Sequence, residues 1–119
     1  MTLNCIIIDD EPLAAELLAS YARKTLFLNL IGVFNSAVEG IKVIRENRVD
    51  LIFLDIQMPE LSGLEFAKIL PKETKIIFTT AFSQYAVDGY KANAVVYLMK
   101  PVSFVDFLAG ANRALEWFR

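Results

Sequence analysis

The sequence contains no histidine and only one cysteine, and each scarcity excludes a kind of chemistry. Without histidine, Ser-His-Asp and Cys-His nucleophile systems are ruled out, together with most zinc sites. A single cysteine cannot build a disulfide framework, and Cys5 lies in an apolar run where a buried, inert thiol is the expected role. Carboxylates, lysine, threonine and the backbone remain to carry chemistry. The expected location is a reducing compartment, the cytoplasm.

Long apolar runs and clusters of basic residues are missing too. No stretch approaches the ~20 apolar residues needed to span a bilayer, and the N-terminus has no basic region followed by an apolar one. We therefore expect neither a signal peptide nor a membrane anchor. The net charge of −2 gives no general attraction to nucleic acid. We expect any contact with DNA to belong to a separate output domain.

What the sequence has instead is 55% hydrophobic residues, gathered in short runs. Five runs are rich in strand-forming residues, and in the segments between them apolar residues recur every three or four positions. The runs lie at 4–9, 27–34, 50–55, 75–80 and 95–99. This alternation predicts one α/β domain over residues 1–119, with a five-stranded parallel sheet and helices on both faces.

The segments between the runs predict helices with recognisable starts and buried faces. A serine followed three positions later by an acid fits a capping box, as at Ser36, Ser62 and Ser103. Apolar stripes mark the faces expected to cover the sheet. The first stripe comprises Leu13, Leu17 and Tyr21 with Ala14 and Leu18 beside it; the last comprises Phe104, Phe107, Leu108, Ala111 and Leu115.

Polar residues collect where the predicted strands end. Ligands bind to open parallel sheets beyond the carboxyl ends of the strands, so side chains at these positions are expected to converge. The residues are Asp9, Asp10, Asp55, Thr79, Thr80 and Lys100. Three acids, hydroxyl groups and an ammonium at one edge of a sheet indicate a site.

Each of these residues also has an ordinary structural explanation. The acids of "DDEP" fit a solvated turn, with Pro12 opening the next helix at its first position. Asp55 fits a loop cap, and Lys100 a solvated strand end. Their occurrence together favours chemistry. Asp9 and Asp10 then hold Mg²⁺, and Asp55 is a carboxylate nucleophile able to form an aspartyl-phosphate.

Phosphoryl transfer also needs positive charge and hydrogen-bond donors around the transferred group. Lys100 and the Thr80 hydroxyl fit that task beside Mg²⁺.

Four motifs in this order resemble a known family, the receiver domain of two-component response regulators. They are "DD" at 9–10, "LDIQMPELSG" at 54–63, "TTA" at 79–81 and "YLMKP" at 97–101, and the resemblance covers essentially the whole chain. It implies a flavodoxin-like (βα)5 fold with strand order 2-1-3-4-5. The stretch "AFSQYAVDGYKANAVVYLMKP" is similar to regulators with a LytTR-type DNA-binding output domain. Two residues depart from the family pattern: Val96 stands where small or acidic residues are common, and Val102 where phenylalanine usually follows Lys-Pro. Both departures are expected to alter the output face.

The resemblance assigns roles to residues. It implies that Asp55 accepts a phosphoryl group from a partner sensor histidine kinase. Lys100 is then the partner of the phosphate, and a cis peptide bond joins it to Pro101. The implied Mg²⁺ ligands are Asp10, Asp55 and the backbone carbonyl of Gln57, with Asp9 assisting through water.

The resemblance also implies a switch. Thr80, rather than Thr79, is its hydroxyl because it directly precedes Ala81, and Tyr97 is the coupled aromatic residue. Together they change the helix 4, strand 5, helix 5 face to control homodimerisation or an attached output domain. Candidates for exposed positions on that face are Tyr85, Val87, Tyr90 or Lys91, and the sequence does not decide which of them point outward.

The lifetime of the phosphoryl group is expected to depend on two neighbouring side chains. Gln57 and Phe82 each stand two residues after a site residue, and a phenyl ring there hinders the entry of water. The expectation is slow autodephosphorylation that Phe82→Glu accelerates. Gln57 has an alternative role in orienting the water.

Two other functions stay open at this stage. Haloacid-dehalogenase-type phosphatases also use an aspartate nucleophile, Thr, Lys and Mg²⁺, but they need a second acid where this chain has Gln57. An interaction domain that works without phosphorylation is the other alternative. The ending "LEWFR", with Trp117 and Phe118 expected to be exposed, favours a chain cut short after residue 119, with the output domain absent.

Overall fold

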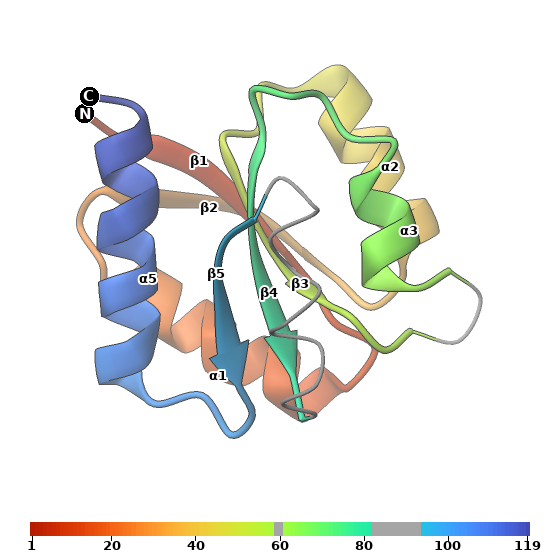
Figure 1. Ribbon diagram of the computed structural model, residues 1–119, viewed down its shortest axis with the longest axis horizontal. Coiled ribbons are helices and arrows are strands. Elements are labelled where there is room, and N and C mark those ends of the chain that lie inside the picture. The colour runs from red at the N-terminus through yellow and green to blue at the C-terminus, as the bar shows by residue number, and fades with distance from the viewer. Residues whose placement is uncertain (59–60, 82–93) are drawn as a thin grey trace.

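The five predicted strands form one parallel sheet in the computed structural model, which describes residues 1–58, 61–81 and 94–119 (Figure 1). The strand order is β2-β1-β3-β4-β5, as the resemblance implied. Every strand starts and ends within one residue of its predicted bounds. The strands are β1 (Leu3–Ile8), β2 (Leu28–Phe34), β3 (Leu51–Asp55), β4 (Lys75–Thr80) and β5 (Ala94–Met99).

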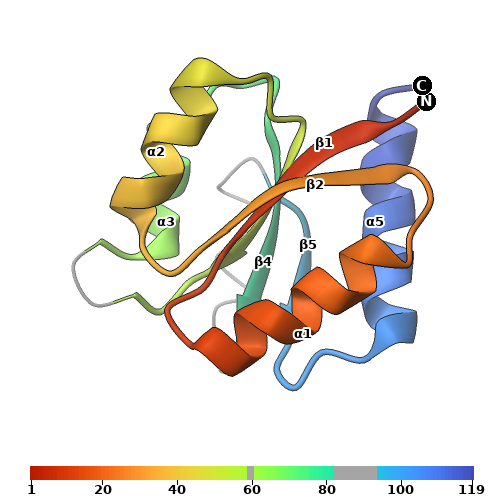
Figure 2. The same ribbon diagram turned by 180° about the vertical axis from the view of Figure 1, so that it is seen from behind.

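Helices cover both faces of this sheet, which confirms the predicted architecture. In the two opposite views α1 and α5 lie on one side of the sheet, and α2 and α3 on the other (Figures 1 and 2). The bounds are α1 (Pro12–Arg23), α2 (Ala37–Glu46), α3 (Gly63–Ala67) and α5 (Phe104–Trp117). None of the helices in the described ranges is both long and apolar enough to cross a membrane.

The serines singled out in the sequence begin three of these helices. The hydroxyl oxygens of Ser36, Ser62 and Ser103 each accept a hydrogen bond from the backbone N–H three residues later. At Ser62 the capping box is complete, because the Glu65 carboxylate also accepts the serine N–H. Pro12 occupies the start of α1, where its missing N–H leaves no hydrogen bond unmade.

Strand side chains point alternately into two cores. Ile7 and Phe53 face α1 and α5, and the Phe53 ring stacks on Phe107 with centroids 4.6 Å apart. Their neighbours Ile6 and Ile52 face α2 and α3. All four strand residues are fully buried, which is why the central strands read as continuous apolar runs rather than alternating ones.

The apolar stripe predicted for the first helix is wrong at two positions. Leu13 is 89% exposed and Leu17 is also exposed, so neither covers the sheet. The buried face of α1 is Ala15, Leu18, Ala19 and Ala22. Small alanine side chains allow the helix backbone to lie close to the strands, and this contact decides which face turns inward.

The last helix follows its predicted stripe more closely. Phe107, Ala111 and Leu115 are buried, although Phe104 is on the exposed side of the helix start. At the C-terminus Trp117 is 62% exposed, as expected, and its ring lies 4.5 Å from the Lys75 ammonium. The expected exposure of Phe118 is wrong, because its ring is partly buried against the α1 and α5 core.

Several predictions made from the sequence concern residues outside the described ranges. They comprise the fourth helix and the positions Phe82, Tyr85, Val87, Tyr90 and Lys91.

Candidate functional site

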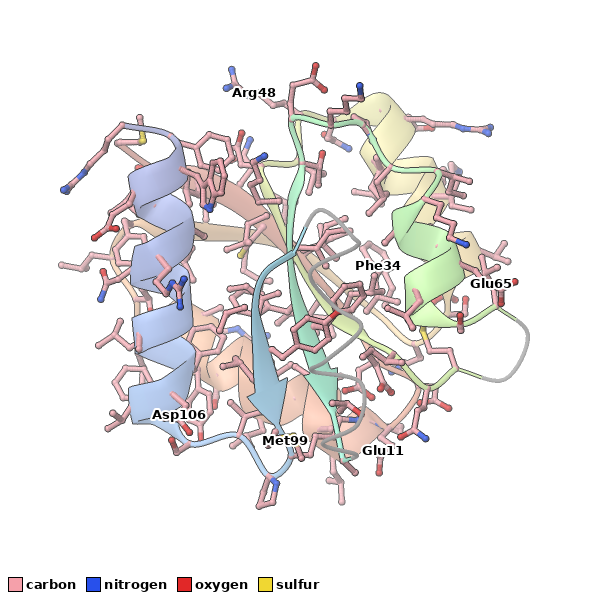
Figure 3. The ribbon with its side chains drawn as sticks, viewed as in Figure 1. Glu11, Phe34, Arg48, Glu65, Met99 and Asp106 are labelled. Atoms are coloured by element: carbon pink, nitrogen blue, oxygen red, sulfur yellow. The ribbon has the colours of Figure 1, made fainter. Side chains whose placement is uncertain are left out.

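The carboxyl ends of the strands bring the predicted polar residues to one edge of the sheet. Asp9 follows β1 and Asp55 closes β3, where it lies in register with Thr79 on β4. Lys100 follows β5 directly. Figure 3 shows Glu11 and Met99 at this edge and Arg48 at the opposite one. Asp9 and Asp55 are both buried, so their charges are withdrawn from bulk water.

The Lys100 ammonium lies among three carboxylates. Its Nζ is 3.1 Å from Asp9 Oδ2 and 3.3 Å from Asp55 Oδ2. The shortest contact, 2.7 Å, is with Glu11 Oε1. The convergence of Asp9, Asp55 and Lys100 that the strand ends predicted is therefore present. The peptide bond between Lys100 and Pro101 is cis, as the resemblance implied.

Glu11 is the site residue that the sequence reasoning missed. The sequence places Glu11 only in a turn open to solvent, and its side chain is 65% exposed. A lysine side chain is long enough to reach such a residue from another strand end. The useful signal was the position of Glu11, which directly follows the acid pair and has its own N–H bonded to Asp9 Oδ1 at 2.9 Å.

Asp10 lies beside this cluster rather than within it. One carboxylate oxygen from each of Asp9, Glu11 and Asp55 lies within 4.8 Å of the other two. Among the described residues, this group of three does not include Asp10. Asp10 is half-buried, and its side chain adds a small contribution that raises the pKa of the Asp55 carboxyl. It also lines a pocket of about 370 Å³ with Asn35 and Ser36.

The surroundings of Asp55 disfavour its ionised form. Burial raises the pKa of this carboxyl to about 7, and the neighbouring charge of Asp9 acts in the same direction. The Gln57 N–H, which donates to Asp55 Oδ1 at 3.0 Å, and the Lys100 charge lower the pKa and offset part of that effect. Asp55 is thus a carboxylate held close to its titration point at neutral pH.

The pKa of Lys100 is raised as well, which for a lysine favours the charged form. Burial would lower its pKa, but the hydrogen bond to Glu11 and the charges of Asp9 and Asp55 outweigh burial and raise the pKa above its ordinary range. The same hydrogen bond and charge from Lys100 lower the pKa of Glu11. The lysine is therefore a permanent cation in this site.

The donor set fits Mg²⁺. This ion prefers carboxylate and carbonyl oxygens, and it is commonly held by one or two carboxylates together with water. Here the clustered acids outnumber the single ammonium between them, so negative charge remains uncompensated. Gln57 is exposed next to Asp55, and the proposed role of its carbonyl as a ligand stays a prediction.

The two threonines of β4 face opposite sides of the sheet. Side chains alternate along a strand, so Thr80 shares the face of Phe78, whose ring centroid is 5.0 Å from that of Tyr97. Thr79 faces α1 and α5 and lines a groove of about 390 Å³ with Lys100. Both threonines are fully buried. This alternation places the Thr80 side chain on the face of Tyr97.

Helix α3 presses against the backbone of Asp55. The Gly63 N–H donates to the Ile56 carbonyl at 2.8 Å. A Cβ atom at Gly63 would collide with the carbonyl oxygen of Asp55 and would lie 2.9 Å from the Ile56 Cα. Ile56 is tied in turn to β4, through its N–H to the Thr79 carbonyl at 3.1 Å. The backbone at Asp55 is therefore fixed on both sides.

Fold and site together define a class, that of parallel α/β domains with an acid cluster and a lysine beyond the strand ends. A family profile described as "Response regulator receiver domain" matches residues 5–112. The chain belongs to this family, whose members are signalling domains of two-component response regulators.

Curated relatives extend the comparison. Over 116 residues the chain is 42% identical to an uncharacterized response regulatory protein of Vibrio cholerae, covering 96% of this chain and 49% of that protein. Over 102 residues it is 41% identical to the transcriptional regulatory protein BtsR of Escherichia coli, covering 84% and 43%. The chain therefore spans just under half the length of these relatives.

Solved structures agree with the fold. The response regulatory domain of mrkE from Klebsiella pneumoniae superposes with a TM-score of 0.85 at 27% identity, covering 96% of both chains. The BeF3-activated DrrB receiver domain gives a TM-score of 0.82 at 21% identity, covering 98% of this chain and 99% of that one. The latter likeness shows the fold alone.

Proposed function

We propose that this domain is a phosphorylation-dependent switch in which Asp55 accepts a phosphoryl group from a sensor histidine kinase. The observation that carries the proposal is a buried carboxyl with its pKa raised to about 7, 3.3 Å from the Lys100 ammonium. Membership of the receiver family supplies the partner class. The cytoplasmic location expected from the sequence belongs to this proposal.

In the proposed transfer, an Asp55 carboxylate oxygen attacks the phosphorus of a phosphohistidine. The bond from phosphorus to the imidazole nitrogen breaks, the electron pair returns to the imidazole, and an aspartyl-phosphate forms. Lys100 neutralises charge on the phosphoryl oxygens throughout. The reaction therefore needs no histidine in this chain.

The proposed Mg²⁺ ligands are the side chains of Asp10 and Asp55 and the backbone carbonyl of Gln57, with Asp9 contributing through water. When bound, the ion would offset negative charge on the phosphoryl oxygens. Before the ion binds, the clustered carboxylates produce a locally negative potential, which attracts a divalent cation.

The proposed switch uses the face shared by Thr80 and Tyr97. A new phosphoryl group brings nearly two negative charges and strong acceptor oxygens, and the Thr80 hydroxyl moves to donate to one of them. Tyr97, packed on Phe78, then turns into the space that Thr80 leaves. A modest free-energy difference between two packing arrangements is enough to shift the population.

The proposed output is homodimerisation or control of an attached LytTR-type DNA-binding domain. One relative, BtsR, is named a transcriptional regulatory protein, and the chain matches 43% of its length. Slow loss of the phosphoryl group belongs to the same proposal, with Gln57 beside Asp55 and Phe82 outside the described residues.

The test is intact-mass detection of phosphoryl incorporation from acetyl phosphate, with and without Mg²⁺. We expect the wild-type domain to gain one phosphoryl group only with Mg²⁺, and Asp55→Ala to gain none. Asp50→Asn is a matched control, because Asp50 is a buried acid at the other end of the same strand. Incorporation into Asp55→Ala equal to that of the wild type would refute the assignment of Asp55.

A further inference from the structure

Glu11 holds the Lys100 ammonium from the exposed side of the acid cluster. Its contact of 2.7 Å is shorter than those of Asp9 and Asp55 with the same nitrogen. The Glu11 side chain is largely in solvent, whereas the other two carboxylates are buried. Lys100 is thus shared between a solvent-facing anion and two buried ones.

The hydrogen-bonding capacity of Lys100 limits this arrangement. An ammonium carries three N–H donors, and three carboxylates already surround it. A phosphoryl group on Asp55 brings additional acceptor oxygens close to the same nitrogen. The Asp55 carboxyl loses its own charge on forming the acyl phosphate, so the new phosphoryl oxygens compete with the charged carboxylates of Asp9 and Glu11 for Lys100.

The unequal burial of Asp9 and Glu11 decides which of their contacts with Lys100 weakens first. Releasing Asp9 would leave a buried carboxylate without its cation, which is strongly unfavourable. Releasing Glu11 returns an exposed carboxylate to water, and exposed ion pairs contribute little free energy. Glu11 is therefore the partner that Lys100 gives up most easily.

We infer that Glu11 is a positioning residue that competes with the incoming phosphoryl group for Lys100. This inference rests on the proposed function of Asp55 and adds that Glu11 slows the phosphorylation of Asp55. In the resting domain Glu11 draws the ammonium toward solvent and places a negative charge beside the path of an anionic donor. Removing that charge frees Lys100 for the phosphoryl oxygens and makes phosphorylation faster.

The test compares phosphorylation by acetyl phosphate at saturating Mg²⁺ in the wild type, Glu11→Gln and Glu11→Ala. Glu11 provides no side-chain cap for α1, so both variants are expected to fold. At low salt and subsaturating donor, both should react roughly two- to fivefold faster, the range of an exposed ion pair. At about 1 M salt the advantage should shrink toward one, because screening removes the charge effect.

Equilibrium binding supplies a second measurement that does not depend on turnover. With Mg²⁺ saturating, calorimetric titration with beryllofluoride, used as a mimic of the phosphoryl group, should show tighter binding to Glu11→Gln by a similar factor. A matched control is Glu16→Gln, which removes an exposed carboxylate paired with Arg23 on the outer part of the same helix. This control should behave as the wild type in both assays.

The outcomes separate the inference from the function on which it rests. Unchanged or slower phosphorylation of both Glu11 variants overturns the inference, as does an equal acceleration in Glu16→Gln or an advantage that persists at high salt. Absence of phosphoryl incorporation in the wild-type domain overturns instead the proposed function of Asp55.

Discussion

Strand β3 has a buried aspartate at each end, and the two acids occupy opposite kinds of environment. Asp50 precedes the strand; its Oδ2 accepts the Asn4 N–H at 2.8 Å and its Oδ1 accepts Arg48 Nε at 3.1 Å. Asp55 closes the strand, accepts the Gln57 N–H and faces Lys100, but Asp9 adds a second negative charge beside it. The charge of Asp50 is satisfied by hydrogen-bond donors and a cation, whereas Asp55 has a second negative charge beside it.

The difference separates an acid with an evident structural role, Asp50, from the acid proposed to be functional, Asp55. Asp50 fastens the start of β3 to β1, since its backbone N–H also donates to the Asn4 carbonyl at 2.8 Å. The Asp55 side chain contacts Lys100 after β5, but burial and the neighbouring charge of Asp9 raise its pKa to about 7. A buried carboxyl whose neighbours disfavour its charged form is a candidate for chemistry, because a proton, a cation or a covalent modification at that carboxyl relieves the imbalance.

The largest expected effect on stability comes from replacing Asp50, the acid whose charge is satisfied by its partners. Asp50→Ala leaves the half-buried Asn4 N–H without its acceptor and should lower the free energy of unfolding by about 2 kcal/mol. Asp55→Ala should lower it far less, or not at all. Urea unfolding of both variants at pH 8 without Mg²⁺ measures this contrast. Equal losses would show that the two acids contribute alike to the fold.

The pH dependence of stability sharpens the comparison. The folded-state pKa of Asp55, about 7, lies above the value near 4 of an unfolded chain, so the folded domain binds this proton more tightly. Its contribution to stability is greatest below pH 4 and is lost as the pH rises through 7. Asp55→Asn should therefore be more stable than the wild type at pH 8, by on the order of 2 kcal/mol.

That advantage should vanish toward pH 4, where the wild-type carboxyl is protonated too. Urea unfolding of the wild type and Asp55→Asn across this range, without Mg²⁺, provides the measurement. A difference that stays constant with pH would contradict the raised pKa.

Affinity for Mg²⁺ should follow the same titration. Carboxylate ligands bind the ion in their deprotonated form, so protons compete with the metal below the raised pKa of Asp55. Binding should weaken by about tenfold for each pH unit below 7, for one proton displaced per ion. Isothermal titration between pH 5.5 and 8 tests this, and affinity independent of pH would place the ion elsewhere.

The smallest expected effect on stability concerns Thr79, the polar residue of β4 that lies in register with Asp55. Its hydroxyl is buried and has no hydrogen-bond partner in the part of the chain that the structure describes. Replacing it with the similarly shaped valine removes an unsatisfied polar group and should stabilise the domain by about 1 kcal/mol. Thermal unfolding of Thr79→Val measures this effect, and a loss of stability would indicate that the hydroxyl is satisfied in solution.

The sequence predicted the sheet well because the signals were local. Continuous apolar runs define buried strands, and serine with an acid three residues later marks helix starts regardless of the remaining fold. The face of α1 was not predictable in this way. Leu13 and Leu18 belong to adjacent apolar stripes of one helix, and only packing against the sheet selected the alanine-rich side.

The candidate site was predicted as far as strand ends define it. Asp9, Asp55 and Lys100 follow directly from strand boundaries in a parallel sheet. The contact between Glu11 and Lys100 was not predictable, since it depends on how far a flexible side chain extends. The closer association of Glu11 than of Asp10 with this cluster likewise depends on the turn geometry after β1.

The absence of a side chain at Gly63 bears on how a change at Asp55 is accommodated. Helix α3 rests against the carbonyl of Asp55 with no room for a methyl group, and the next residue is tied to β4 through the Thr79 carbonyl. If Asp55 accepts a phosphoryl group as proposed, its backbone therefore has little freedom to move away from the new charge. The adjustment would fall on the side chains around the acid, while the peptide chain beneath them serves as a fixed reference.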